Sequence, residues 1–130
     1  MGDLSKNFSV REFRCRCGQC DFNGSTISSE LIVLLELIRE KMSHVYGDLS
    51  ITINSGVRCP EHNRAVGSNP NSQHLLGTAA DIVVQCKKDN SKVAPGVVAE
   101  YVNSIFNRKY GIGIYDTFTH IDVRKTQARW

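Results

Sequence analysis

One segment of the chain, from Ser28 to about His44, repeats its apolar residues at the three- and four-residue steps of an amphipathic α-helix. Ser28 or Ser29 can cap the amino end of this helix, and Gly47-Asp48 stops it. The spacing therefore predicts one long helix with a single apolar face. The residues on that face are Leu31, Leu34, Leu35, Ile38, Met42 and Val45.

The rest of the chain predicts a second helix and several short strands. The second helix is expected to begin at Pro95, because proline suits the first turn of a helix. Residues 55–71 are rich in Gly, Pro, Asn and Ser and are predicted to be mostly loop. Because helices and strands do not alternate strictly, the order favours an α+β fold with a small, mainly antiparallel sheet and two main helices. The expected strands are residues 50–54, 79–85, 111–115 and 118–124.

The composition indicates one globular domain that covers residues 1–130. Of the 130 residues, 41% are hydrophobic and 22% are charged, which disfavours disordered and coiled-coil classes. The longest apolar run, Leu31–Leu35, is far shorter than the roughly 20 residues that cross a bilayer. Residues 1–6 show no secretory signal. We therefore expect a protein that is made in the cytoplasm and does not insert into a membrane.

The net charge is a mild +3, from 16 Lys and Arg against 13 Asp and Glu. The basic residues are dispersed along the chain, so the sequence lacks the basic stripe that is typical of a dedicated nucleic-acid-binding protein. We expect no nucleic-acid partner, and we take the protein to be a monomer.

Two histidines and one aspartate form a candidate metal site. His74 lies seven residues before Asp81, and the small residues between them allow the two segments to approach closely. His120 lies on a predicted strand that would hold it towards a cleft. Three such ligands suit zinc and leave one tetrahedral position for water, as in catalytic sites. Each residue also has an ordinary alternative: a surface histidine for His74, a strand-end hydrogen bond for Asp81, and a surface ion pair for His120 with Asp122.

Several segments resemble the zinc D-Ala-D-Ala carboxypeptidase family, which includes vancomycin-resistance dipeptidases and many phage endolysins. The segment Ser72–Asp81, with the later His120, resembles the family signature. Residues 55–58 resemble its Ser-Gly-Tyr-Arg segment, and residues 8–20 and 111–115 resemble a phage-type subgroup. The resemblance implies the fold shared with the Hedgehog signalling domain, one catalytic zinc ion, and peptidoglycan stem peptides as the substrate.

The resemblance also implies a role for each matching residue. His74, Asp81 and His120 would hold the zinc ion, which activates water for attack on a peptide bond. Arg58 would bind substrate, because its planar guanidinium matches a carboxylate at two points. The alternative for Arg58 is a structural role in its own loop. Ser72 would either contact the substrate or fix the loop before His74.

The general base is where the chain departs from the family. Much of the family has Glu or Asp three residues before the final histidine, and this chain has Thr117 there. Asp116 is the favoured replacement, provided that a bulge near Thr117 turns its carboxylate into the site. Asp122 is the rival, because strand alternation places it beside His120. Asp122 could instead orient that ligand, or bind the metal in its place.

The five cysteines are an odd number in a chain without an export signal, so they do not predict a complete disulfide framework. Cys15, Cys17 and Cys20 form a cluster that one further ligand would complete as a second, structural metal site. Because no clean C-x-x-C pair repeats, reduced packing thiols or a late disulfide are favoured over that site. The candidates for the further ligand are Cys59, His62 and Cys86.

The sequence therefore predicts a zinc metallopeptidase, either a D-Ala-D-Ala carboxypeptidase or an endolysin-type endopeptidase. We expect it to be encoded by a phage or prophage and to act on the bacterial cell wall. The alternative is a zinc-bearing module for cell-wall binding or phage structure, without catalysis. Thr117, in place of the family's carboxylate, is the main support for that alternative.

Overall fold

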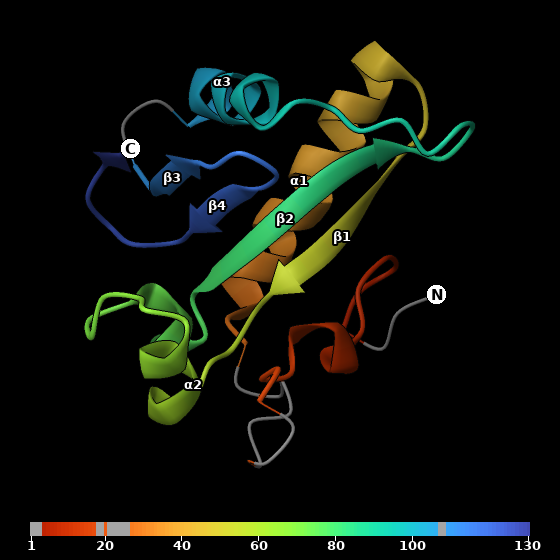
Figure 1. The fold of residues 1–130 in the computed structure, drawn as a ribbon. Helices are drawn as coiled ribbons and strands as arrows, with labels where there is room; N and C mark the ends of the chain where they lie inside the picture. Colours follow the sequence, from red (N-terminus) through yellow and green to blue (C-terminus); the bar gives the residue numbers. More distant parts are fainter. Residues whose placement is uncertain (1–3, 18–19, 21–26, 107–108) are drawn as a thin grey trace.

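The computed structural model describes residues 4–17, 20, 27–106 and 109–130. Figure 1 shows a twisted sheet with one long helix packed along it. The strands are β1 (Leu49–Ser55), β2 (Ala79–Cys86), β3 (Gly111–Ile114), β4 (Thr119–Asp122) and β5 (Ala128–Arg129). The helices are α1 (Ser29–Tyr46), α2 (Pro60–Ala65) and α3 (Pro95–Ile105), with short 3-10 helices η1 (Val10–Phe13) and η2 (Gln73–Leu76).

The strands form one sheet in the order β1-β2-β4-β3-β5. Neighbouring strands are antiparallel except for β5, which runs parallel to β3. This arrangement confirms the predicted α+β class, the mainly antiparallel sheet and the two main helices. None of the helices in the described ranges combines the length and the apolar character needed to cross a bilayer.

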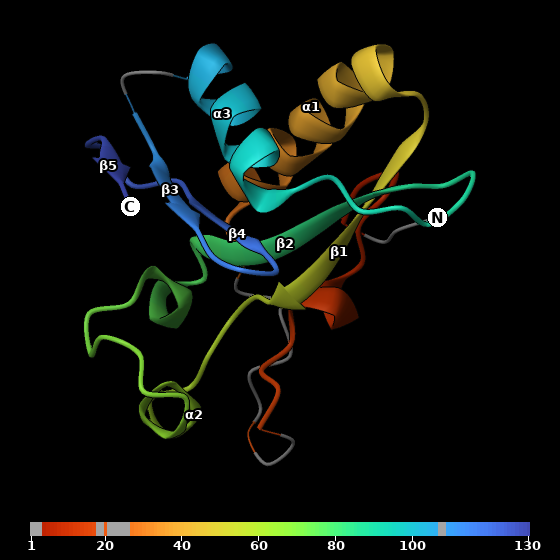
Figure 2. The ribbon, with the colours of Figure 1, turned by 45° about the horizontal axis from the view of Figure 1, so that its top comes forward.

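Helices α1 and α3 cover the same face of the sheet (Figure 2). Helix α1 begins where predicted, because the Ser28 hydroxyl accepts a hydrogen bond from the Leu31 amide at 3.3 Å. Its apolar side chains pack over β1 and β2, while α3 packs over β3 and β4. Val45, expected on the buried face, lies in the last turn before Gly47 and is 62% exposed. Each fully buried leucine or isoleucine of this core contributes roughly 1.5–3 kcal/mol to folding.

The sequence predicted neither α2 nor β5. Helix α2 interrupts the segment expected to be loop; it has only six residues and begins with Pro60. Strand β5 has two residues and brings Trp130 beside β3, where the Trp130 amide donates to the Ile112 carbonyl at 3.1 Å. Neither segment is long enough to show a hydrophobic period, which explains why patterning misses both.

Candidate metal centre

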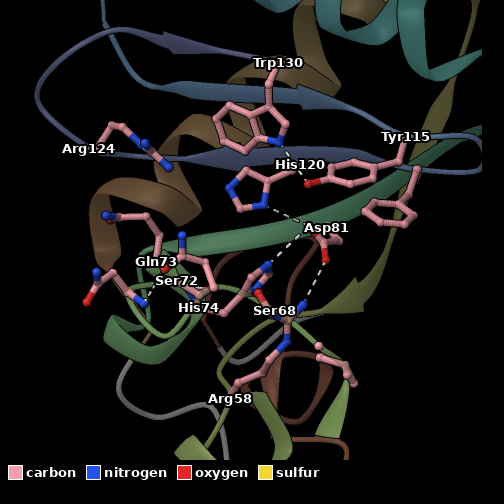
Figure 3. Close-up of a pocket in the computed structure, with 15 residues that line it drawn as sticks. Arg58, Ser68, Ser72, Gln73, His74, Asp81, Tyr115, His120, Arg124 and Trp130 are labelled. Carbon is pink, nitrogen blue, oxygen red and sulfur yellow. Dashed lines mark hydrogen bonds and ion pairs between the residues drawn. The ribbon is translucent and has the colours of Figure 1, made fainter. Parts of the chain in front are cut away.

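Two of the three predicted metal ligands lie on the sheet face opposite α1 and α3, and the third reaches it from a neighbouring 3-10 helix. Asp81 in β2 and His120 in β4 are direct cross-strand partners, so their side chains leave the sheet side by side. His74 comes from η2, just before β2, and points at the same spot (Figure 3). Asp81 Oδ1 lies 3.2 Å from His74 Nε2 and 3.0 Å from His120 Nδ1. All three side chains are buried.

The second nitrogen of each imidazole fixes which nitrogen faces Asp81. His74 Nδ1 lies 2.7 Å from the Gly56 carbonyl oxygen, which can only accept, so this nitrogen carries the proton. His120 Nε2 carries a proton for the same reason, because it lies 2.8 Å from the carboxylate oxygen Asp122 Oδ2. In the neutral rings, two nitrogen lone pairs therefore point at a carboxylate oxygen. Such a convergence of three acceptors is relieved either by a proton on an imidazole, which then donates to Asp81, or by a bound cation.

The spacing of these donors fits a tetrahedral metal ion. Zinc binds imidazole nitrogen and carboxylate oxygen at about 2.0–2.2 Å, which places neighbouring ligand atoms about 3.3–3.6 Å apart. The distances of 3.0 and 3.2 Å are close to that range, and all three ligand atoms lie within 4.8 Å of one another. The residues present therefore fit Zn²⁺, with His74 Nε2, His120 Nδ1 and one Asp81 oxygen as the donors.

The charges around the site favour an ionised Asp81. Burial acts to raise the pKa of Asp81, but hydrogen bonds with His120 and His74 outweigh it and hold that pKa at about 2. Burial lowers the pKa of His120, and its contacts with Asp122 and Asp81 more than compensate, so the net shift is upwards. The Asp122 pKa lies well below its usual range despite burial, because His120 and Arg124 donate to it. The five residues His74, Asp81, His120, Asp122 and Arg124 thus form one continuous chain of contacts in that order.

Local backbone geometry positions His74. The Ser72 hydroxyl accepts a hydrogen bond from the His74 amide at 3.2 Å and so caps η2, which is the loop-fixing alternative predicted for this serine. Gly77 ends η2 in the left-handed region at φ 72°. The Gly56 carbonyl holds the ring itself. Ser72 also lines the cavity above the site, so substrate contact by its hydroxyl stays a prediction.

Asp122 lies behind His120 and is fully buried. Besides its bond to His120, it accepts from Arg124 Nε at 2.8 Å and Nη2 at 2.7 Å. Gly111 on β3 leaves the space that this carboxylate occupies, since a Cβ there would overlap it. This is the orienting position that the sequence left open as one of three roles for Asp122.

A cavity of about 780 Å³ opens above the metal ligands. Arg58, Tyr115, Arg124 and Trp130 line it, and Asp81 is the only carboxylate among its described lining residues. Tyr115 Oη accepts a hydrogen bond from Trp130 Nε1 at 2.9 Å, and the Arg124 guanidinium lies 5.1 Å from the Trp130 ring centre. Sequence reasoning missed Tyr115, Arg124 and Trp130 as site residues. Strand alternation already placed Arg124 on the His120 face, whereas Trp130 directly follows β5, which was not predicted.

Arg58 is buried beside the ligands. Its Nη2 lies 3.4 Å from Asp81 Oδ2, and its Nη1 donates to Asn63 Oδ1 at 3.1 Å. Burial lowers the pKa of Arg58, and the charge of Asp81 opposes that shift. Arg58 therefore has a structural partner in α2, within the segment that its alternative role supposed to be loop, and also reaches the cavity.

Asp116 lies away from the metal ligands. It is exposed in the β3–β4 turn and lines a separate hollow beside Pro95 and Lys92. The expected bulge near Thr117 is absent from this hairpin, because the β3–β4 register runs regularly through to Ile114 opposite Thr119. A four-residue turn joins the strands instead, closed by the Tyr115 amide donating to the Phe118 carbonyl at 3.1 Å. The turn points Tyr115, rather than Asp116, into the cavity.

Comparison with known proteins identifies relatives for most of the chain. The model of a family described as Peptidase M15 matches residues 6–122, a range that contains His74, Asp81 and His120. The zinc D-Ala-D-Ala carboxypeptidase of Streptomyces albus G is 35% identical to the chain over 82 residues. That alignment covers 58% of this chain and 31% of the relative, so the chain spans about a third of the length of the curated protein it matches.

Proposed function

Because the chain belongs to the Peptidase M15 family, we propose that it is a zinc peptidase that hydrolyses peptide bonds in the stem peptides of bacterial peptidoglycan. The observation that carries the proposal is the convergence of His74 Nε2, Asp81 and His120 Nδ1 at the base of an open cavity. The similarity to a zinc D-Ala-D-Ala carboxypeptidase supports both the metal and the class of substrate.

In this proposal, His74, Asp81 and His120 hold the zinc ion. Zinc bound there supplies Lewis acidity, which polarises a peptide carbonyl and promotes the ionisation of water. The Gly56 carbonyl and Asp122 keep the two imidazoles in the tautomers that expose a lone pair to the ion. Three protein ligands leave a further coordination position on the cavity side.

The cavity walls supply groups that suit a peptide with a free carboxylate. Arg58 and Arg124 present guanidinium groups on the lining, where each can pair with a carboxylate in two places. Tyr115 Oη accepts from Trp130, so its own O–H can donate to a carbonyl oxygen that gains negative charge during the reaction. We assign Arg58 and Arg124 to substrate binding and Tyr115 to stabilising that oxygen.

The residue that accepts the proton of the attacking water is tested by separate variants. Asp122 contacts His120 directly, whereas Asp116 would need the β3–β4 turn to rearrange before it reached the cavity. Asp116→Asn tests the turn carboxylate alone. A loss with Asp122→Asn also reports on the contact of Asp122 with His120, so zinc content is measured together with cleavage for both variants. We expect Asp116→Asn to retain most of its activity and Asp122→Asn to lose far more.

Mass spectrometry of defined muropeptides after treatment with zinc-loaded protein tests the function. Loss of a terminal residue identifies a carboxypeptidase, and an internal cut supports the endolysin-type alternative. His74→Ala should abolish cleavage, while Leu76→Ala, an exposed change in the same 3-10 helix, should not alter it. A folded His74→Ala protein that cuts at the normal rate would refute the proposal. A zinc-loaded wild-type protein that binds muropeptides without cutting any would instead support the non-catalytic module.

A further inference from the structure

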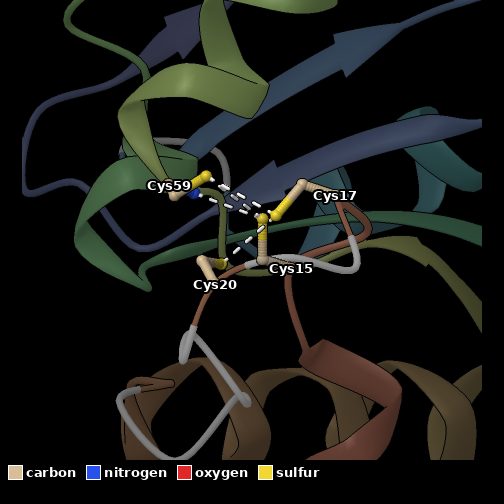
Figure 4. A group of neighbouring side chains, drawn as sticks. All are labelled: Cys15, Cys17, Cys20 and Cys59. Atoms are coloured by element: carbon tan, nitrogen blue, oxygen red, sulfur yellow. Dashed lines mark hydrogen bonds between the residues drawn. The ribbon is translucent and has the colours of Figure 1, made fainter.

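Four cysteine sulfurs converge at a second place, between the N-terminal segment and the loop before α2 (Figure 4). Cys15, Cys17 and Cys20 follow η1, and Cys59 precedes α2. The Cys15–Cys59, Cys17–Cys59 and Cys17–Cys20 sulfurs lie 3.7, 3.8 and 3.4 Å apart. All four sulfur atoms lie within 4.8 Å of one another.

These distances match a tetrahedral thiolate site. Zinc binds thiolate sulfur at about 2.3 Å, which places neighbouring sulfurs about 3.8 Å apart on the edges of a tetrahedron. A disulfide would require about 2.05 Å. We propose that Cys15, Cys17, Cys20 and Cys59 bind a second Zn²⁺ ion in a closed, structural site. This proposal does not depend on the peptidase activity.

The alternatives favoured by the sequence explain the arrangement less well. Packing thiols account for Cys15 and Cys59, which are buried, but Cys20 is exposed and still directs its sulfur to the other three. A disulfide would join only two of four sulfurs that all lie within 4.8 Å of one another. Cys59 is one of the three residues that the sequence offered as the further ligand, and its separation from Cys15 by 44 positions hid the pairing from spacing rules.

The surroundings suit bound thiolates. The Cys59 amide lies 3.4 Å from Cys15 Sγ, and the His62 amide lies 3.4 Å from Cys59 Sγ. Such N–H groups offset part of the negative charge that four thiolates bring to a divalent ion. Arg16 and Arg58 lie close enough to Cys15 for their charges to interact.

The site would fasten the N-terminal segment to the loop that shapes the metal centre. Phe13, just before the cluster, accepts a hydrogen bond from the Val57 amide at 2.8 Å. Gly56, the next residue back, holds His74 through its carbonyl. Cys59 is adjacent to Arg58. An ion at the cluster therefore closes a link between the three N-terminal cysteines and the backbone that orients a catalytic ligand.

Metal counting in a variant without the His/Asp centre tests the proposal. His74→Ala, purified in reducing buffer, should hold one zinc per chain by native mass spectrometry and elemental analysis. Adding Cys20→Ser should remove that ion, because an exposed ligand is lost with little change to packing. Adding Cys86→Ser, which alters the cysteine outside the cluster, should retain it. The cobalt form of His74→Ala should also show thiolate-to-metal charge-transfer absorption.

Three results would overturn the proposal. They are a folded His74→Ala protein without zinc, an intact mass that reveals a disulfide among these cysteines, and bound iron in place of zinc. The wild-type protein provides the independent count, because it should hold two zinc ions and lose only one with His74→Ala. Failure of peptide cleavage leaves these counts unchanged, so the two proposals are tested separately.

Discussion

The His/Asp centre and the sulfur cluster are built on different kinds of backbone. Asp81 and His120 belong to paired strands whose register fixes their separation, and Gly56 and Asp122 hold the imidazoles from behind. The four cysteines lie in irregular segments outside the helices and strands. The first site can therefore keep its geometry without an ion, whereas the second depends on the ion to keep its segments together. The two sites also differ in the number of protein ligands. Three ligands leave zinc open to a substrate, whereas four close its coordination shell.

Metal removal gives the largest expected difference between the two sites. A chelator such as dipicolinate should abolish muropeptide cleavage, since no other group in the site supplies Lewis acidity. The open His/Asp centre should lose its ion first, with little change in melting temperature. Release of the second ion should then lower the melting temperature. Parallel measurements of zinc content, cleavage and thermal unfolding check this order, with pyridine-3,5-dicarboxylate, an isomer that does not chelate zinc, as the control. Simultaneous loss of activity and stability would contradict the comparison.

Gly56→Ala should perturb both regions at once. An added Cβ would lie 2.7 Å from the Phe13 Cα, and this neighbour is backbone that has little freedom to move. Such overpacking costs about 1–3 kcal/mol of unfolding free energy, and we expect the upper part of that range. Denaturant unfolding measures the loss of stability, and zinc content shows whether one or both metal sites lose their ion. Gly96→Ala is the matched control, because its Cβ would meet nothing within 4 Å. Equal stability of the two variants would mean that the Phe13–Gly56 contact carries no energy.

Asp122→Asn should affect only the His/Asp centre. The amide keeps the shape of the side chain but weakens its hold on His120, and losses of this kind typically cost about 10–100-fold in metal affinity or activity. Zinc titration and cleavage rates measure the effect, and Asp89→Asn, an exposed change after β2, is the control. The zinc bound in a His74→Ala background should stay the same with Asp122→Asn. A loss of that ion would show that the two sites are not independent.

The sequence predicts the parts of the molecule that repeat or alternate. The three- and four-residue period gives α1, strand alternation gives the shared face of His120 and Arg124, and short spacing links His74 to Asp81. It fails where residues meet through tertiary contacts alone. Cys59 lies beside Cys15 from 44 positions away, and Trp130 directly follows a two-residue strand. Asp116 stays outside the cavity because the hairpin has no bulge. No periodic pattern in the sequence indicates any of these three arrangements.

The smallest predicted effect concerns how the N-terminal segment is held when the sulfur cluster is empty. Glu36 on α1 accepts hydrogen bonds from Ser5 Oγ at 2.6 Å and from Asn7 N and Nδ2 at 2.8 and 2.7 Å. Burial acts to raise the pKa of Glu36, but these bonds lower it overall. A depressed folded-state pKa gives stability that is present above the unfolded pKa of about 4.3 and is lost as the pH falls through the folded value.

Glu36→Gln should therefore reduce the change in melting temperature between neutral and acidic pH, by an amount worth less than about 1 kcal/mol because the group is partly solvated. Glu40→Gln, an exposed change on the same helix, should leave that pH dependence as it is. Thermal scans from pH 7 downwards on zinc-loaded and zinc-free protein measure both. The two forms are compared only at pH values where metal analysis finds the zinc still bound, because acid protonates its ligands. The effect should be larger in zinc-free protein, where these hydrogen bonds hold the segment without help from the cluster. An equal effect in both forms would mean that the sulfur cluster does not restrain residues 5–7, and that its influence ends at η1.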